Sequence, residues 1–204
     1  MDGILNVVLG QLGGGGLGTL GGILGTGQNE TQSAVSTAVN VITGAMAQNA
    51  AQPAGAQALN AALEKDHDGS IFENVIGFLG NAAVGPGAGI LGHVLGSSQP
   101  QVQQGIAEKT GMSMDKVLPL LIMVAPLVLG ALGKMKKEKE MDSEAVAATL
   151  AAERHAAEQQ DDGMLGSILG MLGGAAQPAP APQHQSSAGG LLGVIGGLFK
   201  KKGS

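Results

Sequence analysis

An unbroken apolar stretch, residues 117–132, is the most hydrophobic part of the 204-residue chain and constrains its fold more than any other feature. At about 16 residues it is shorter than the ~20 that a transmembrane helix needs, and it contains Pro119 and Pro126. The lysines between residues 134 and 139 suit the negative end of a helix dipole. We therefore expect residues 114–134 to form a buried central helix rather than a membrane span.

The composition sets what can surround this helix. Hydrophobic residues make up 44% of the chain, as in globular proteins, but there are 3 Phe and no Trp or Tyr. Leu, Ile, Val, Met and Ala must therefore supply nearly all the buried area. Gly occurs 36 times, and because Gly weakens helices we expect close packing where it lies inside one. Cys is absent, which excludes disulfides and Cys-ligated metals.

Charge and the first residues favour a cytoplasmic protein that does not bind nucleic acid. The net charge is −5 and the pI about 5.3, whereas phosphate contacts need clustered Lys and Arg. The chain starts Met1-Asp2-Gly3 without a basic segment, so the apolar residues that follow do not resemble a secretory signal. The localisation expected is the cytoplasm, with association at a membrane surface as the alternative.

Apolar spacing predicts an all-α domain over residues 31–160. Helices are expected over residues 31–51, where Val35, Ala38, Val39, Ile42, Ala45 and Met46 share one face, and over residues 55–65, 71–79, 99–110 and 142–160. Residues 89–96 are expected to form a brief apolar turn. Residues 1–30 are interpreted as a Gly/Leu-rich flexible arm, although Gly10, Gly14, Gly18 and Gly22 recur at the spacing of a helix face. Residues 161–204 comprise a Gly/Leu segment, a Pro/Ala/Gln linker and an amphipathic tail that ends in lysines.

The spacing of Ala107, Gly111, Ser113 and Val117 is typical of a helix-turn-helix. Gly111 would make the turn, Ser113 would cap the next helix, and Ala107 and Val117 would pack between the two helices. The second helix turns apolar after its first few residues and offers no Arg, Asn or Gln for base edges. We predict the shape of a DNA-binding motif without its activity.

Two interpretations apply to the segment EKDHDGSIFE, residues 64–73. As a calcium loop it would place Glu64, Asp66 and Asp68 at the first, third and fifth positions, but the twelfth position is Val75 where a carboxylate belongs. As a helix start, Ser70 and Glu73 form the S-x-x-E capping box. We favour the capped helix and keep Asp66, Asp68 and Glu64 as the weaker metal candidates.

No catalytic constellation emerges from the sequence, and no cofactor or small-molecule substrate is predicted. The G-x-G-x-x-G patterns, such as the one at Gly87, Gly89 and Gly92, follow no strand, so dinucleotide binding is rejected. The four histidines, His67, His93, His155 and His184, lack metal-ligand spacing and are interpreted as surface or packing residues. We expect a protein that is not an enzyme.

The order of segments within residues 31–80 recurs within residues 115–173, which suggests a degenerate duplication. In both, a long apolar helix and a second helix precede Asp-Gly, at Asp68-Gly69 and at Asp162-Gly163. A shorter word also recurs, as GILNVVLG, GILGHVLG, GMLGSILG and GLLGVIGG, starting at residues 3, 89, 163 and 190. Such short pieces are unstable alone, so each must dock on its own domain, another copy or lipid.

Three segments together resemble the bacterial YidB-like family, domain of unknown function 937: LEKDHDGSIFENVIGFLG, GILGHVLG and GIAEKTGMSMDKVLPLLIMVAPLVLGALGK, from residues 63, 89 and 105. The resemblance covers residues 31–140. It implies an all-helical domain with a homeodomain-like helix-turn-helix. It supplies no activity and no catalytic residues.

The leading hypothesis is a non-catalytic interaction or scaffold protein that binds protein, including copies of itself, through its Gly/Leu segments. The alternative is a membrane-peripheral protein whose apolar tail inserts while lysines meet anionic headgroups. The residues expected to contact a partner or membrane are Leu191, Leu192, Ile195, Leu198, Phe199, Lys200, Lys201 and Lys202.

Overall fold

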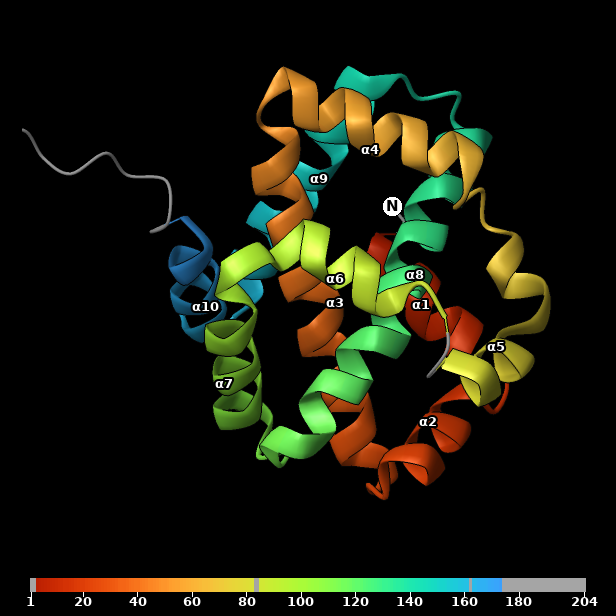
Figure 1. Cartoon of the computed structure of the whole chain (residues 1–204), viewed down its shortest axis with the longest axis vertical. Helices are drawn as coiled ribbons and strands as arrows, with labels where there is room; N and C mark the ends of the chain where they lie inside the picture. The colour runs from red at the N-terminus through yellow and green to blue at the C-terminus, as the bar shows by residue number, and fades with distance from the viewer. Residues whose placement is uncertain (1–2, 83–84, 162, 174–204) are drawn as a thin grey trace, which may run out of the picture.

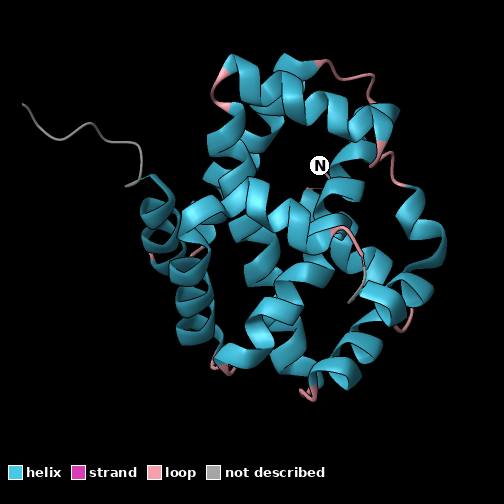
Figure 2. Ribbon diagram, in the orientation of Figure 1, coloured by secondary structure: helices cyan, strands magenta, loops and turns pink. Residues whose placement is uncertain are grey.

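Helices and short loops make up the part of the chain that the structure describes, residues 3–82, 85–161 and 163–173 of a computed structural model (Figures 1 and 2). This confirms the all-α class. The helices are α1 (Ile4–Leu12), α2 (Gly16–Leu24), α3 (Gln28–Ala50), α4 (Pro53–Lys65), α5 (Val75–Asn81), α6 (Gly87–Leu95), α7 (Gln99–Thr110), α8 (Met114–Glu138), α9 (Ser143–Gln160) and α10 (Met164–Gly173), with 3₁₀ turns at η1 (Ser70–Asn74) and η3 (Gly96–Ser98).

The long helices α3 and α8 pack against each other and the shorter helices surround them (Figure 1). The expected inward residues of α3 are buried, and α8 is buried along most of its length from Val117 to Met135. By length and composition α8 could cross a bilayer, but 78% of its apolar window is already buried inside the fold. The prediction of a buried central helix is therefore confirmed, with the helix continuing to Glu138.

The two halves of the described chain run through corresponding elements. Helices α2 to α5 correspond to α7 to α10, and α1 and α6 precede them with related sequences. Gly25 and Gly111 take left-handed φ values of 62° and 73° shortly before α3 and α8, and Gly69 and Gly163 take 95° and 91° shortly before η1 and α10. The second helix of each half packs on its last one, as α2 on α5 and α7 on α10. The similarity between the halves thus begins before residue 31, the start that the sequence pattern suggested.

Glycine notches at corresponding places in α3 and α8 hold the two halves together. The segments VITGAM and LVLGAL, which start at residues 41 and 127, place Gly44 and Gly130 alike. A Cβ at Gly44 would lie 2.5 Å from Leu169 of α10, and a Cβ at Gly130 would lie 2.5 Å from Ile71 of η1. In both halves an aliphatic side chain fills the space that the missing Cβ leaves.

A second close approach joins α6 to α8 at Pro126. Proline has no N–H, so it cannot donate the helical hydrogen bond to the carbonyl of Ile122 four residues earlier. Gly87, at the start of α6, lies directly against this carbonyl, and a Cβ there would overlap the Ile122 oxygen. The proline inside α8 and the glycine at the start of α6 are therefore complementary.

The N-terminal residues differ from the flexible arm predicted for residues 1–30. Residues 4–24 form α1 and α2, whose axes meet at 82°. Ile4, Val8 and Leu12 of α1 are fully buried, because a spacing of four residues puts them on one face of the helix. Leu20 of α2 is fully buried as well. The backbone N–H of Ile4 donates to Glu153 Oε2 of α9 at 3.2 Å. Burial of this aliphatic face offsets the helix cost of the glycines, which the composition alone did not show.

Two further segments are more regular than the sequence indicated. Residues 89–96 were expected to be a brief turn, but residues 89–95 belong to helix α6, whose Leu91 and Leu95 are buried. Residues 164–173, placed outside the predicted domain, form α10, which packs on α7, α3 and α9. The packed part of the chain therefore extends past residue 160 to Gly173.

Replacement of Gly87 by Ala should destabilise the fold by about 1–3 kcal/mol, because the added methyl group overlaps the Ile122 carbonyl. Gly92 of the same helix is the matched control: no described atom lies within 4 Å of its Cβ position, so Gly92→Ala should be neutral or stabilising by up to about 1 kcal/mol. Urea unfolding followed by circular dichroism measures both. Equal effects of the two substitutions would contradict the close packing of α6 on α8.

Candidate functional site

The carboxylates of the segment 64–68 do not converge on one point. Glu64 Oε1 accepts hydrogen bonds from Lys136 Nζ at 2.9 Å and from the side chain of Asn60 at 3.0 Å. Asp68 Oδ1 accepts one from the backbone N–H of Ser70 at 3.1 Å. Within residues 3–82, 85–161 and 163–173, no three His, Asp or Glu side chains are grouped so that they could hold a metal ion. Glu64, Asp66 and Asp68 are thus not brought together.

These hydrogen bonds also set the acidity of the two carboxyls. The bond from Lys136 is the main cause that lowers the pKa of Glu64, and the bonds from Ser70 lower the pKa of Asp68. Both groups are therefore anionic at neutral pH. They lie at the solvent surface, where Asp68 bonds to the backbone of Ser70 and Glu64 pairs with Lys136.

The capping box predicted at Ser70 and Glu73 is wrong. Residues 70–74 form a 3₁₀ turn without a side-chain cap, and the helix that follows is capped by Asn74, whose Oδ1 accepts from the Gly77 N–H at 3.0 Å. Gly69, with φ of 95°, lies so close to α8 that a Cβ would be 2.9 Å from that of Lys134. The Asp-Gly-Ser segment is a tight turn pressed against the central helix, which a local sequence pattern cannot indicate.

The three described histidines are separated in the fold, and His184 lies outside the described residues. His67 is half-buried beside α8, and burial lowers its pKa because the charged ring would lose water. His93 and His155 are exposed on α6 and α9, and His155 shares a 3.0 Å hydrogen bond with Gln159 of the same helix.

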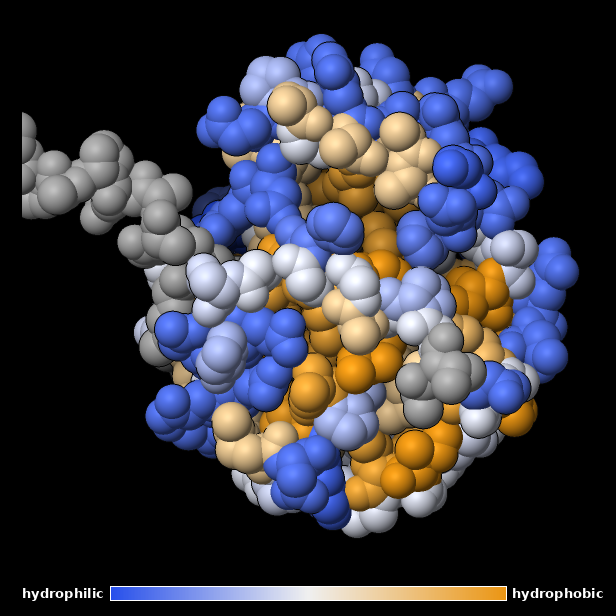
Figure 3. All heavy atoms as spheres, viewed as in Figure 1, coloured by the Kyte–Doolittle hydropathy of each residue, from blue (hydrophilic) through white to orange (hydrophobic). Residues whose placement is uncertain are grey.

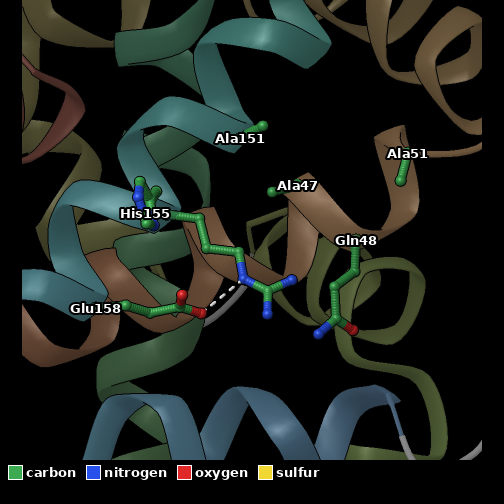
Figure 4. A pocket seen from close by; sticks show the side chains of 7 residues that line it. Ala47, Gln48, Ala51, Ala151, His155 and Glu158 are labelled. Carbon is green, nitrogen blue, oxygen red and sulfur yellow. Dashed lines mark hydrogen bonds and ion pairs between the residues drawn. The ribbon is translucent and has the colours of Figure 1, made fainter. Parts of the chain in front are cut away.

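An open depression of about 370 Å³ lies between α3 and α9 (Figure 4). Its lining consists of Ala47, Gln48, Ala51, Ala151, Arg154, His155 and Glu158. The guanidinium of Arg154 donates to Glu158 Oε1 at 2.8 Å, and the amide of Gln48 donates to the carbonyl of Leu169 at 2.9 Å. The cation is thus neutralised within its own helix, and Gln48 serves to hold α10.

The turn between α7 and α8 has part of the predicted geometry, but the predicted cap by the Ser113 side chain is wrong. Gly111 is left-handed, Val117 is fully buried, and Ser113 occupies the N-cap position with extended backbone but without a side-chain cap bond. Beyond its first turn α8 is buried in the core. Most of its side chains from Leu120 to Met135 therefore face the protein interior.

An ion pair that the sequence analysis missed fastens α10 to the fold. Asp161, between α9 and α10, accepts from Lys109 Nζ at the end of α7 and from the backbone N–H of Leu165. Its side chain is 11% exposed, and burial alone would raise its pKa. The hydrogen bonds and the charge of Lys109 outweigh this effect, so the pKa of Asp161 is lowered. Residues 52 apart in sequence carry no local signal of such a pair.

The surface around α2 consists largely of exposed apolar side chains and glycines. Ile23, Ile76 and Met114 are 50%, 53% and 48% exposed. Gly18 and Gly22 of α2 are exposed, and no described atom lies within 4 Å of their Cβ positions. Figure 3 shows hydrophobic atoms over α2 at the lower edge of this face. The sequence held a signal for this surface, because residues 16–24 contain no charged residue and Thr19 is their one polar side chain.

Comparison with known proteins identifies a family and no activity. The bacterial family of unknown function DUF937 matches residues 6–135. The chain belongs to this family. The match reaches from α1 into the last part of α8, so α1 and α2 lie within the family domain, whereas the sequence resemblance was limited to residues 31–140. No curated protein and no solved structure matches the chain.

The expected contact residues of the tail all lie outside the described residues. They are Leu191, Leu192, Ile195, Leu198, Phe199, Lys200, Lys201 and Lys202.

Replacement of Asp161 by Asn should destabilise the protein at neutral pH by about 2 kcal/mol, because Lys109 loses a partly buried anionic partner. A lowered pKa in the folded state means that the carboxylate stabilises the fold above the pKa of the unfolded chain. This contribution disappears as the pH falls below about 4. Urea unfolding at pH 7 and in acid should therefore show a difference between wild type and Asp161→Asn that shrinks with falling pH. The exposed Glu108→Gln on α7 is the control; an equal loss there would contradict the assignment.

Proposed function

We propose that this chain is a non-catalytic helical interaction or scaffold protein that self-associates through its Gly/Leu segments. The observation that supports this most is the outward placement of glycines on the short helices. No described atom lies within 4 Å of the Cβ positions of Gly10 in α1, Gly89 and Gly92 in α6, and Gly166 and Gly170 in α10. All five glycines are exposed at the surface.

Packing inside the domain does not require glycine at these places. Each one costs a helix up to about 1 kcal/mol relative to Ala, which would meet no obstacle there. A helix without outward side chains does, however, let a second helix approach with its backbone unusually close. The inward sides of the same helices are filled by buried Leu, Ile and Val, so each helix is fixed to the domain. Its outward side offers glycines to a partner, beside polar residues such as Asn6, His93 and Ser167.

The polar groups of the described residues favour a structural role. Arg154 and Lys109 are paired with Glu158 and Asp161, and Lys136 is paired with Glu64. The homeodomain-like helix-turn-helix of α7 and α8 acts, in this proposal, as a packing element, because its second helix is the core of the domain. The Gly-rich segments outside the core serve as contact surfaces.

A membrane-peripheral role is the second candidate, and the sequence of the tail favours it. Residues 191–199 are Gly or apolar, and Lys200–202 follow directly. Apolar side chains and adjacent lysines together bind anionic lipid surfaces.

Self-association should be visible by light scattering as a mass that rises with the concentration of the full chain. Gly10→Gln, Gly92→Gln and Gly170→Gln combined should lower the association and leave the free energy of unfolding unchanged or raised, because Gln favours helices more than Gly does. Gln101→Ala, on the polar side of α7, should change neither. A full chain that stays monomeric over a wide concentration range would refute the homomeric form of the proposal.

Membrane association is tested by flotation of the full chain with vesicles that contain phosphatidylserine. Leu192→Glu and Ile195→Glu should remove the chain from the lipid fraction if the tail inserts, and Gln183→Glu and Gln185→Glu in the linker are the charge-matched control. Absence of the wild-type chain from the lipid fraction at low salt would rule out this candidate.

A further inference from the structure

Exposed apolar residues and glycines lie on α2 and on the two elements that pack beside it, α5 and the start of α8. We call Gly18, Gly22, Ile23, Ile76 and Met114 the α2 patch. Ile76 of α5 lies over the beginning of α2, with its Cδ1 3.8 Å from the Cβ position of Gly15. At the other end, Lys116 Nζ of α8 donates to the carbonyl of Gly25 at 2.8 Å, two residues past Ile23. Met114 stands in the same first turn of α8.

The corresponding surface in the second half of the chain consists of polar side chains. Helix α7, the counterpart of α2, exposes Gln101, Gln104 and Glu108. Leu169 of α10 fills the notch at Gly44 and is fully buried, whereas Ile71 fills the notch at Gly130 and Ile76 is left outside. The second half of the chain thus presents polar residues to water at this place, whereas the first half presents the apolar α2 patch.

The sequence itself contains a segment of the right kind to cover this patch. Three copies of the short Gly/Leu word lie in α1, α6 and α10, and each buries its Leu, Ile or Val residues in the domain. The fourth copy, GLLGVIGG at residues 190–197, lies outside the described residues. It continues directly into Leu198, Phe199 and three lysines.

The charges around the patch complement those of this segment. Glu73 lies three residues before Ile76, Asp115 follows Met114, and Glu30 lies in the first turn of α3, which begins after Gly27. Lys116, the basic residue at this edge, is bound to the Gly25 carbonyl. All 16 acidic residues of the chain precede residue 163, and the residues from 174 on carry Lys200–202 and no acid. The edge of the patch is thus acidic and the tail is basic.

The connection is long enough for the tail to reach the patch of its own chain. Residues 174–190 can span up to about 55–60 Å, whereas a domain of this size is about 40 Å across. A tethered segment is present near its own domain at an effective concentration of order millimolar, well above that of a second chain in dilute solution.

We propose that residues 190–202 dock on the α2 patch of the same chain, with the apolar residues over α2 and the lysines beside Glu30, Glu73 and Asp115. The docked tail closes the first half of the domain as the polar side of α7 closes the second. It also leaves the outward glycines of α1, α6 and α10 free, so this inference does not depend on the self-association proposed above.

The chain contains no Cys, so a pair of spin labels can be placed in the full-length protein by two substitutions. Gln28→Cys, at the exposed start of α3 beside the patch, is combined with Ser204→Cys at the end of the tail. Gln101→Cys with Ser204→Cys is the matched pair on the polar surface of α7. Pulsed electron-spin measurements should give a short, narrow distance distribution for the first pair and a broad one for the second.

Introduction of lysines into the apolar contact provides the decisive comparison. Ile23→Lys and Ile76→Lys, at positions about half exposed, should broaden the distribution of the first pair, whereas Gln101→Lys and Gln104→Lys should leave it narrow. Circular dichroism confirms that each variant is folded. Equally broad distributions for both label pairs, or a narrow one that survives Ile23→Lys and Ile76→Lys, would overturn the proposal.

Dilution of the labelled chain with excess unlabelled chain separates this inference from the proposed function. The short distance should persist, because both labels belong to one molecule. Its loss on dilution would show that a neighbour's tail fills the patch and would overturn docking within the chain. A monomeric chain with a short distance keeps this inference and refutes self-association; a self-associating chain with broad distributions does the reverse.

Discussion

Burial of α8 between α3 and the shorter helices is the interaction on which the rest of the structure depends. The helix is apolar for long enough to cross a bilayer, so it must be covered on nearly all sides to be stable in water. Aromatic residues are too few to cover it, and small residues do so by close approach. Gly87 lies on the carbonyl that Pro126 leaves without a donor, and Gly69 and Gly130 let η1 press against the helix. The high glycine content thus allows the close packing that buries the hydrophobic helix.

Glycine has two opposite roles in this domain, and the position of the missing Cβ separates them. At Gly44, Gly87 and Gly130 the Cβ would collide with a neighbouring helix or turn, so the fold itself explains the residue. At Gly18, Gly92 and Gly170 the Cβ would meet open space, so the fold does not explain it. A helix pays backbone entropy in both cases. The second set therefore directs attention to contacts outside the isolated domain.

Long amphipathic segments were predictable from the sequence, and segments determined by tertiary packing were not. The range predicted for residues 99–110 is that of α7, and Val146 and Leu150 are the buried anchors of α9, because polar residues on the opposite faces make the periodicity clear. In α2 the exposed positions are mostly glycine, and in α1 they carry Gly10 and only a few polar residues, so the same periodicity resembles a low-complexity arm. The S-x-x-E pattern at Ser70 failed, because the chain there makes a 3₁₀ turn that follows the left-handed Gly69 and lies against α8. The Lys109–Asp161 pair joins distant residues and had no local pattern.

The correspondence between the halves explains why the α2 patch and the tail belong to one argument. When two halves of a fold correspond, each exposed surface can be compared with its counterpart. Here α7 shows the polar residues expected on a helix that stays exposed to water, and α2 lacks them. Polar residues at three exposed positions of α7 meet that requirement, whereas α2 shows Gly18, Gly22 and Ile23. Exposing the isoleucines costs free energy in proportion to their apolar area, and covering them by a tethered segment requires little entropy beyond ordering that segment. The Gly/Leu segments in α1 and α10 already pack on the domain through Leu and Ile contacts. A further copy at residues 190–197 can therefore bind by the same kind of contact, at the apolar surface that the α2 patch provides.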